Sequence, residues 1–420
     1  MSISSSFYTG LSGLDTSSTA MQVIGDNIAN LQTTGFKGSS VLFEDVLGAA
    51  LSGVTGSNQT GAGAKVSTVD GNFTQGSLET TDVTTDIAIN GKGFYAVKDA
   101  NSSEVYYTRA GHFVFDNQGY YVDPNGYRVQ GYLYDTTGTT LIENLVDLQI
   151  NQSSMIAPKT TSAVQMGLNL DASDATGVFN INNPSGTSSY SATTNIYDSL
   201  GQSHTIQVFF TKTAAQTWRW SAVIDGSDVQ GGAPGVYQLY GTGVLNFNTS
   251  GALTTVMPVN FYTGAITFAD GITPPATTIE YTGTTQYGSA SATENISQNG
   301  FAAGTVSGIT INGDGNIVAN YTNGVNRNYA RLALADFPNL NGLVRKGQNL
   351  YQSTTKSGDP LYNKPGVGGM GSISSSMLEE SNVDMAAEFI RMIITQRGYQ
   401  ANSKVISTTD DMLSQLINIR

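Results

Sequence analysis

Very few side chains in this sequence could act as nucleophiles, bases or metal ligands. The 420 residues include no cysteine and only two histidines, His112 and His204. Without cysteine, disulfides, thiolate metal sites and thiol nucleophiles are all excluded. Ser203 and His204 are neighbours, and neighbours on a strand point to opposite faces, so they do not form a nucleophile–base pair. We expect His204 on the surface of a strand, His112 in a hairpin, no catalytic residue and no enzymatic activity.

Two short motifs resemble ligand-binding loops. Residues 366–371 (GVGGMG) match G-x-G-x-x-G, but no predicted strand precedes them and no acidic residue follows in a βαβ context. Asn312, Asp314 and Asn316 have the spacing of the first ligands of a calcium loop, but Ile317 and Asn323 occupy the positions of the glycine and the bidentate acid. We interpret the first motif as a hinge and the second as a β-turn, and we expect no cofactor and no metal.

Composition narrows the class of protein. The chain has 19 basic and 32 acidic residues and a formal charge of −13, which argues against a nucleic-acid partner. No apolar run reaches the ~18–20 residues that cross a bilayer, so we expect no membrane insertion. Lys37 is the first basic residue, so we expect no cleavable signal peptide with a positive leader. Only 12% of residues are charged and 48 are glycine, which is typical of β-rich proteins with many turns.

Both ends of the chain carry helical heptad patterns. Large apolar residues recur every seven positions, and all ten prolines lie between Pro124 and Pro365. The predicted assembly seam consists of Phe7, Leu14, Met21, Ile28, Met385, Met392, Tyr399, Ile406 and Leu413. An intramolecular helical hairpin would explain the pattern as well as an intermolecular coiled coil does. Because one seam buries too little surface to offset the entropy of ordering each helix, we expect these helices to need further copies.

The C-terminal helix has a candidate start signal. Ser376 and Glu379 have capping-box spacing, which predicts a helix beginning near Met377 or Leu378. In that position Glu379 and Glu380 would place negative charge at the positive end of the helix.

The middle of the chain alternates with period two. Residues 86–91, 93–97, 112–115, 205–210 and 218–224 read as strands separated by turn residues. Trp218 and Trp220 fall on one face of their strand, and we expect both in a core. A third β-rich block spans about 301–351, and its pattern of short strands and turns is similar to that of the block before residue 146.

The predicted fold class is α+β and mainly β, with two β-rich domains in a chain that runs out and back and terminal coiled-coil helices that form an inner domain. The predicted domains are a terminal helical domain (1–35 and 373–420), a linker region (36–70), a two-segment β domain (71–145 and 298–372) and an inserted outer β domain (146–297).

Longer motifs stand at both ends of the chain, at residues 11–14, 24–30 and 33–37 and at residues 380–384, 388–390 and 396–402. They resemble the N-terminal and C-terminal signatures of the bacterial flagellar axial family, which comprises rod, hook and hook-associated subunits. Residues 73–76, 87–91, 107–111 and 129–131 are similar to the shared β domain of rod and hook subunits. The 146–297 insertion, with 195–204 and 207–212 inside it, favours the hook branch.

The resemblance implies a structural subunit that self-assembles into a flexible, curved tube and transmits motor torque to the filament. Implied partners are many copies of the chain, the distal rod and hook–filament junction proteins, the hook cap and the flagellar type III export apparatus, and the implied location is the extracellular part of the flagellum. A distal rod subunit is the alternative within the family. Outside it, a β-rich adhesin with oligomerisation helices would fit the composition, and a glycan-active enzyme would need two placed carboxylates.

The resemblance also points to individual residues at the two junctions between helix and β domain. Gly35 is expected in the left-handed conformation that closes a helix. The motif positions are Asn27, Asn30, Thr33, Gly35 and Phe36 near the N-terminus, and Asn382, Val383, Asp384, Gln396 and Arg397 near the C-terminus.

Overall fold

The computed structural model describes residues 3–51, 58–150, 155–262 and 266–418. The fold class is confirmed: most regular structure is β, and the two long helices are α1 (Ile3–Ala29) and α3 (Met385–Asn418). The chain forms two compact units. Unit 1 contains Met1–Gln152, Gly308–Asn320 and Asn326–Arg420, and unit 2 contains Ser153–Ser307 and Tyr321–Val325. The predicted 146–297 insertion falls largely in unit 2, while the finer domain division stays a prediction.

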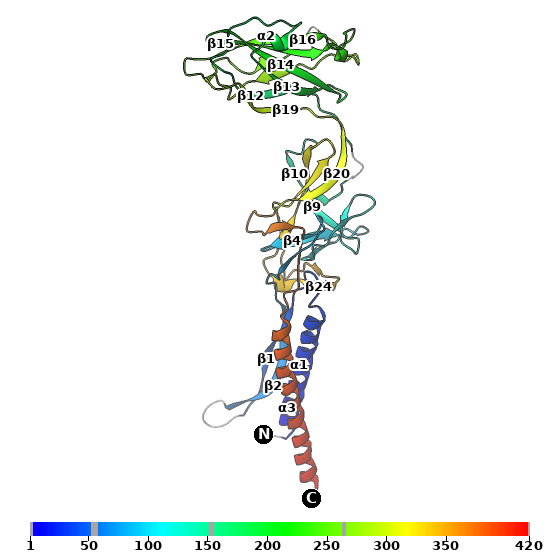
Figure 1. Cartoon of the computed structure of the whole chain (residues 1–420). Helices are drawn as coiled ribbons and strands as arrows, with labels where there is room; N and C mark the ends of the chain where they lie inside the picture. The colour runs from blue at the N-terminus through cyan, green and yellow to red at the C-terminus, as the bar shows by residue number, and fades with distance from the viewer. Residues whose placement is uncertain (1–2, 52–57, 151–154, 263–265, 419–420) are drawn as a thin grey trace. The chain divides into compact units, whose positions relative to one another are not determined.

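The two terminal helices of unit 1 lie antiparallel (Figure 1). Gly10 of α1 faces Ile406, Gly13 faces Asn402, and Ser17 faces Gly398, so the partner's number falls as the α1 number rises. A Cβ atom on Gly13 would lie 2.4 Å from the Asn402 side chain, and the lack of a side chain there lets the helices approach closely. None of the helices in the described part of the chain is long and apolar enough to cross a membrane.

The region predicted as a linker contains a long β-hairpin. Strands β1 (Ser39–Leu51) and β2 (Asn58–Gly71) pair antiparallel from Ser39↔Gly71 to Leu51↔Asn58, and the hairpin packs on α1. The sequence of this hairpin lacks the alternation of buried and exposed residues that predicts a strand, because apolar residues such as Leu42, Phe43 and Leu47 are exposed.

The predicted start of the C-terminal helix is wrong. Residues Met377–Glu379 form strand β28, which pairs with β3 (Leu78–Thr80), and α3 begins only at Met385. Asp384 caps this helix, because its Oδ1 accepts hydrogen bonds from the amides of Ala386 (2.8 Å) and Ala387 (3.2 Å). Glu379 therefore does not act on a helix end, and its carboxylate is buried among strands.

The rest of unit 1 is a β body. Its main sheet has the order β21-β22-β9-β5-β6-β25-β24, with β10 on β9 and β23 between β5 and β26. The two short pairs β27-β4 and β28-β3 join the C-terminal segment to the first strands. The remaining elements are β4 (Ile87–Asn90), β5 (Phe94–Lys98), β6 (Val105–Thr108), β7 (Val114–Phe115), β8 (Tyr121–Val122), β9 (Arg128–Tyr134), β10 (Leu141–Asp147), β21 (Asn316–Tyr321), β22 (Asn326–Leu332), β23 (Leu334–Asp336), η2 (Leu340–Gly342), β24 (Val344–Gly347), β25 (Leu350–Gln352), β26 (Leu361–Asn363) and β27 (Ser372–Ser375).

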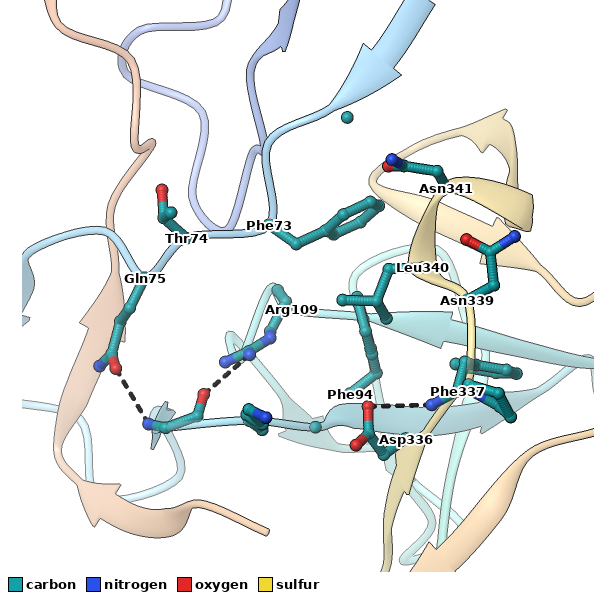
Figure 2. A pocket seen from close by; sticks show the side chains of 15 residues that line it. Phe73, Thr74, Gln75, Phe94, Arg109, Asp336, Phe337, Asn339, Leu340 and Asn341 are labelled. Atoms are coloured by element: carbon teal, nitrogen blue, oxygen red, sulfur yellow. Dashed lines mark hydrogen bonds between the residues drawn. The ribbon is translucent and has the colours of Figure 1, made fainter. Parts of the chain in front are cut away.

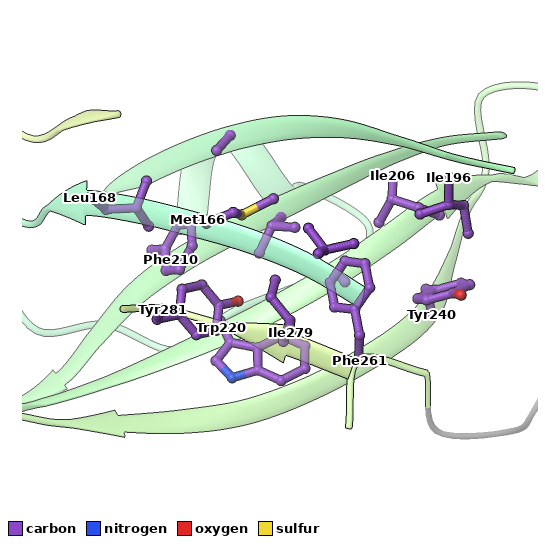
Figure 3. Packing of buried hydrophobic residues seen from close by; sticks show 14 of the residues in the cluster. Met166, Leu168, Ile196, Ile206, Phe210, Trp220, Tyr240, Phe261, Ile279 and Tyr281 are labelled. Carbon is purple, nitrogen blue, oxygen red and sulfur yellow. The ribbon is translucent and has the colours of Figure 1, made fainter. Parts of the chain in front are cut away.

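Unit 2 is a β-sandwich. One sheet has the order β17-β18-β12-β19 and the other β13-β14-β15-β16, and a core of aromatic and aliphatic side chains from both sheets fills the space between them (Figure 3). Trp218 and Trp220 are both buried in this core, as predicted. The elements are β11 (Met155–Ile156), β12 (Ala163–Asn169), α2 (Pro184–Thr187), β13 (Tyr190–Tyr197), β14 (Ser203–Ala214), β15 (Thr217–Asp225), η1 (Gly226–Asp228), β16 (Tyr237–Asn246), β17 (Val259–Asn260), β18 (Thr278–Glu280) and β19 (Ala292–Gln298). The residues of β20 (Gly304–Ile311) are divided between the two units.

The two motifs that resembled ligand loops are both turns. The Asn312–Asn316 turn is confirmed by the Gly315 amide, which donates to the Asn312 carbonyl at 2.9 Å. Residues 366–371 form a closed loop between β26 and β27 rather than an open hinge, because the Gly366 amide donates to the Gly371 carbonyl at 3.0 Å.

The two histidines also differ from expectation. The surface prediction for His204 is wrong: its side chain is buried on β14 because the ring of Phe268 stacks on it. The strand predicted from His112 begins at Val114, and His112 itself contacts Asp86 at 2.7 Å.

Candidate assembly surface

The contact between the two helices combines small residues of α1 with polar and apolar residues of α3, such as Gly13 against Asn402 and Gly10 against Ile406. Gly10, Thr16, Ala20, Ile24 and Asn27 are the buried positions of α1. They recur at intervals that keep them on one side of the helix, toward α3 and the β-hairpin. The large apolar residues of α1 and α3 therefore lie mostly elsewhere.

None of the nine predicted seam residues is buried in the single chain. Phe7, Met385, Tyr399 and Leu413 are exposed, and Leu14, Met21, Ile28, Met392 and Ile406 are half-buried. Further exposed apolar residues on α3 are Phe389, Ile390, Ile393, Ile394 and Met412. Many exposed apolar side chains on two neighbouring helices are typical of a protein–protein contact surface. That these residues form the assembly seam stays a prediction.

A groove on this surface joins the helices to the β-hairpin. It has a volume of about 280 Å³, and Ala20 and Ile24 of α1, Phe43 of β1 and Ile394 of α3 line it. Arg391 is at its rim and donates to Glu388 at 2.9 Å. The groove is suited to an apolar side chain from another molecule.

A buried ionic cluster connects the two chain ends to the β body. The Lys37 ammonium donates to Glu379 Oε1 at 2.6 Å, and Arg109 Nη1 lies 3.4 Å from Glu379 Oε2. All three side chains are buried. The Gly76 amide also donates to Glu379 Oε1 at 2.9 Å, and Lys37 donates to the Thr74 carbonyl at 2.7 Å. Segments from the N-terminus, the β body and the C-terminus therefore meet at one carboxylate.

The electrostatics of this cluster are governed by burial. Desolvation lowers the pKa of the Lys37 amine below its ordinary value, although the nearby Glu379 carboxylate opposes the shift. Desolvation also lowers the pKa of Arg109, again opposed by Glu379. A single carboxylate thus compensates two buried cations, and its removal would leave both without a partner.

The N-terminal motif residues build the turn that leaves α1. Asn27 and Ser39 bond reciprocally: Asn27 Nδ2 donates to the Ser39 carbonyl at 2.7 Å, and the Ser39 amide donates to Asn27 Oδ1 at 2.8 Å. Thr33 donates to the Asn30 side chain at 3.1 Å. Gly35 has the predicted left-handed conformation, with φ of 68°. Gly35 lies in the turn beyond Ala29 and not at the helix end. A Cβ atom on Gly35 would lie 2.5 Å from the Ala110 amide nitrogen, so there is no room for a side chain.

Phe36 and the C-terminal motif complete the junction. Phe36 is buried, and the guanidinium of Arg345 lies 5.2 Å from its ring centre. Asn382 accepts from the Gly38 amide at 2.8 Å and donates to the Asn72 carbonyl at 2.8 Å. The side chain of Val383 also packs near Gly38.

The other two C-terminal motif residues lie apart from this junction. Gln396 and Arg397 are exposed on α3.

A larger pocket lies beside the ionic cluster. It has a volume of about 700 Å³, and its lining includes Phe73, Gln75, Phe94, Arg109 and Phe337 (Figure 2). Arg109 Nη2 donates to the Gly91 carbonyl at 2.8 Å, and the Gly91 amide donates to Gln75 at 2.9 Å. These contacts hold the pocket wall in place and offer no nucleophile–base pair.

Three important residues of this site were not predicted from the sequence. Lys37 and Arg109 lie inside the matched motifs 33–37 and 107–111, so the motifs were an available signal. The capping-box spacing from Ser376 places Glu379 at a helix start instead. Its true partner, Lys37, is too distant in sequence for spacing to reveal.

Family models match four parts of the chain. They are described as flagella basal body rod protein (residues 7–37), flagellar hook protein FlgE/F/G D1 domain (88–157), flagellar basal body protein FlaE D2 domain (167–301) and flagellar basal body rod FlgEFG protein C-terminal (374–419). The four matched regions extend from near the N-terminus to near the C-terminus.

Curated relatives match over nearly the whole length. The flagellar hook protein FlgE of Treponema pallidum is 33% identical over 99% of both chains, and that of Escherichia coli K12 is 32% identical over 99% of this chain and 100% of its own. The crystal structure of Helicobacter pylori flagellar hook protein FlgE2 aligns with a TM-score of 0.53 over 72% of this chain and all of that chain, at 16% identity. That likeness concerns the fold alone.

Terminal helices with an uncovered apolar surface, tied to a β body and accompanied by a β-sandwich, define an axial subunit of the bacterial flagellum. Within that class, the chain belongs to the flagellar hook protein FlgE family. The family is a structural one.

Proposed function

We propose that this chain is the structural subunit of a flagellar hook, a flexible, curved tube that transmits motor torque to the filament. The observation that carries the proposal is the exposed apolar surface of α1 and α3, which the contact between the two helices leaves uncovered. A monomer leaves that surface in water, and stacking many copies removes it from water.

The buried ionic cluster supplies the mechanical connection in this proposal. Torque that enters through the helices must pass to the β body across the short segments around Lys37 and Glu379. Strand pairing at β27-β4 and β28-β3, together with the Lys37–Glu379–Arg109 contacts, resists rotation of the helices against the β body.

Flexibility comes from a different part of the chain. Surfaces with few charges and many small polar residues form interfaces of replaceable, water-mediated contacts. Such contacts exchange at low energetic cost as neighbouring subunits shift, while the apolar helices keep the tube continuous.

The proposed partners follow from the position of a hook in the flagellum. They are the distal rod at one end, the hook–filament junction proteins and hook cap at the other, and the type III export apparatus that delivers subunits to an extracellular tube. The lack of cysteine and the uncovered helix surface are both compatible with passage of an unfolded chain through the export apparatus.

The test replaces one exposed apolar residue by a charge. Ile394 is exposed and lines the groove between α1, β1 and α3. Ile394→Glu should abolish hooks on detergent-stripped basal bodies of a deletion strain, as seen by electron microscopy, because a buried unpaired carboxylate prevents subunit packing. The matched control is Gln400→Glu, an exposed polar position on the same helix, which should retain hooks. Normal hooks with Ile394→Glu would disprove the role of this surface.

A further inference from the structure

One buried histidine of unit 2 has no hydrogen-bond partner among the described residues. His204 lies on β14 and is 2% exposed, and neither ring nitrogen forms a hydrogen bond with the part of the chain that the structure describes. The Oδ2 atom of Asp198, which is also buried, lacks a partner too. Buried polar atoms are nearly always satisfied, so two unsatisfied groups that face each other call for a ligand.

The turn before β14 orients Asp198 toward the histidine. Its Oδ1 atom accepts hydrogen bonds from the amides of Leu200 at 2.9 Å and Gln202 at 2.8 Å. These two bonds fix the carboxylate and leave Oδ2 free, 3.6 Å from His204 Nε2. Two ligands about 2.1 Å from a shared tetrahedral ion are about 3.4 Å apart, which is close to this distance.

A third donor comes from a separate loop. Asp270 lies in the turn after Phe268, and its Oδ1 accepts from the Ile272 amide at 2.9 Å. One ligand atom from each of Asp198, His204 and Asp270 can be chosen so that all lie within 4.8 Å of one another. Asp270 is exposed, so the cluster has a path from solvent.

The imidazole of His204 is held in one orientation. The Phe268 ring stacks on its face, with centroids 3.6 Å apart and an interplanar angle of 6°. Both nitrogens lie in the ring plane, so stacking on the face leaves them accessible. On the side away from Asp198, Nδ1 lies 4.0 Å from Asp228 Oδ2. At this distance Asp228 forms no hydrogen bond with the ring, but it is placed where a carboxylate would accept the second N–H of a metal-bound histidine after a small side-chain movement.

The charge around the cluster is uncompensated. Asp198, Asp228 and Asp270 surround one imidazole, and within the described residues none of them pairs with a lysine or arginine. A buried carboxylate such as that of Asp198 is expected to be paired or to coordinate a cation.

We propose that His204, Asp198 and Asp270 bind a divalent transition-metal ion of the zinc type, with Asp228 as the positioning residue for the imidazole. One nitrogen and a few carboxylate oxygens suit zinc, whereas calcium requires six to eight oxygen ligands. The ion would join the turn before β14 to the loop that carries Asp270, and so stabilise this end of the sandwich. The proposal is independent of hook assembly.

The test titrates Zn²⁺ into the full chain, without a histidine tag, by calorimetry. We expect one ion per chain and a higher Tm for unfolding of unit 2. Asp270→Asn keeps the Oδ1 acceptor of its turn but removes the charged ligand, and it should abolish binding. Asp228→Asn should weaken binding by about 10–100-fold, as loss of a residue that orients a ligand does.

Two controls separate this site from nonspecific binding. Glu294→Gln removes an exposed carboxylate from the same unit, and His112→Gln removes the chain's other imidazole; both variants should bind Zn²⁺ as the unmodified chain does. Absence of binding to the unmodified chain, equal binding by Asp270→Asn, or loss of binding only with His112→Gln would each overturn the proposal.

Discussion

Glu379 is the residue on which both chain ends depend. It receives hydrogen bonds from Lys37 and from the Gly76 amide, and it contacts Arg109. Because burial already disfavours the charged forms of Lys37 and Arg109, the cluster is stable only while the carboxylate is present. A buried ion pair of this kind adds little net stability compared with apolar packing, but breaking it is costly.

Replacing this carboxylate by an amide should therefore be strongly destabilising. We expect Glu379→Gln to lower the free energy of unfolding of unit 1 by about 3–5 kcal/mol, because two buried cations lose their counter-charge. Urea denaturation followed by circular dichroism measures the change. The neighbouring Glu380→Gln, whose partner Ser77 is exposed, should change it by less than about 0.5 kcal/mol. Equal effects of the two substitutions would contradict the assigned role.

At the scale of elements, the boundary between the β body and the C-terminal helix lies between β28 and α3. Met377–Glu379 is committed to β28, and the helix starts with the cap at Asp384. The short segment between them carries Asn382, which bonds to both Gly38 and Asn72.

The helix cap can be tested directly. Asp384→Ala should destabilise α3 by about 1 kcal/mol, because two amide donors lose their acceptor. The expected signal is reduced helical circular dichroism at 222 nm and a lower Tm of the helical transition. Ser376→Ala serves as the comparison, since Ser376 precedes β28 and caps nothing; a helical loss in Ser376→Ala instead would restore the earlier start.

Local pattern predicted the helices and strands well but not their partners. Heptad spacing located α1 and α3, and period-two alternation located β14, β15 and the buried pair Trp218 and Trp220. The spacing of Ser376 and Glu379 gave the wrong start for the C-terminal helix, because capping-box spacing also occurs by chance before a strand. The deciding contact with Lys37 is long-range. His204 was misplaced for the same reason, since Phe268 from a distant loop buries it.

At the scale of the whole molecule, the C-terminal segment has two separable roles. Residues 372–384 complete the β body through β27, β28 and Asn382, while α3 presents the apolar surface. The structure therefore distinguishes a part needed for folding from a part needed for assembly.

Two truncated chains should separate these roles. A chain ending at residue 384 should keep the Tm of its β body but fail to polymerise, because it retains Glu379 and lacks α3. A chain ending at residue 372 should also unfold at lower temperature, because Lys37 and Arg109 lose their counter-charge and β4 loses β27. Differential scanning calorimetry and sedimentation measure both properties. The same β-body Tm in both chains would argue against this division.

The position of Glu379 also bears on when the molecule acquires its final form. Lys37 and Arg109 precede Glu379 by 342 and 270 residues in the sequence, so a chain that emerges with its N-terminal side first presents both cations well before their shared carboxylate. The cluster can therefore close only after the segment that carries Glu379 has emerged.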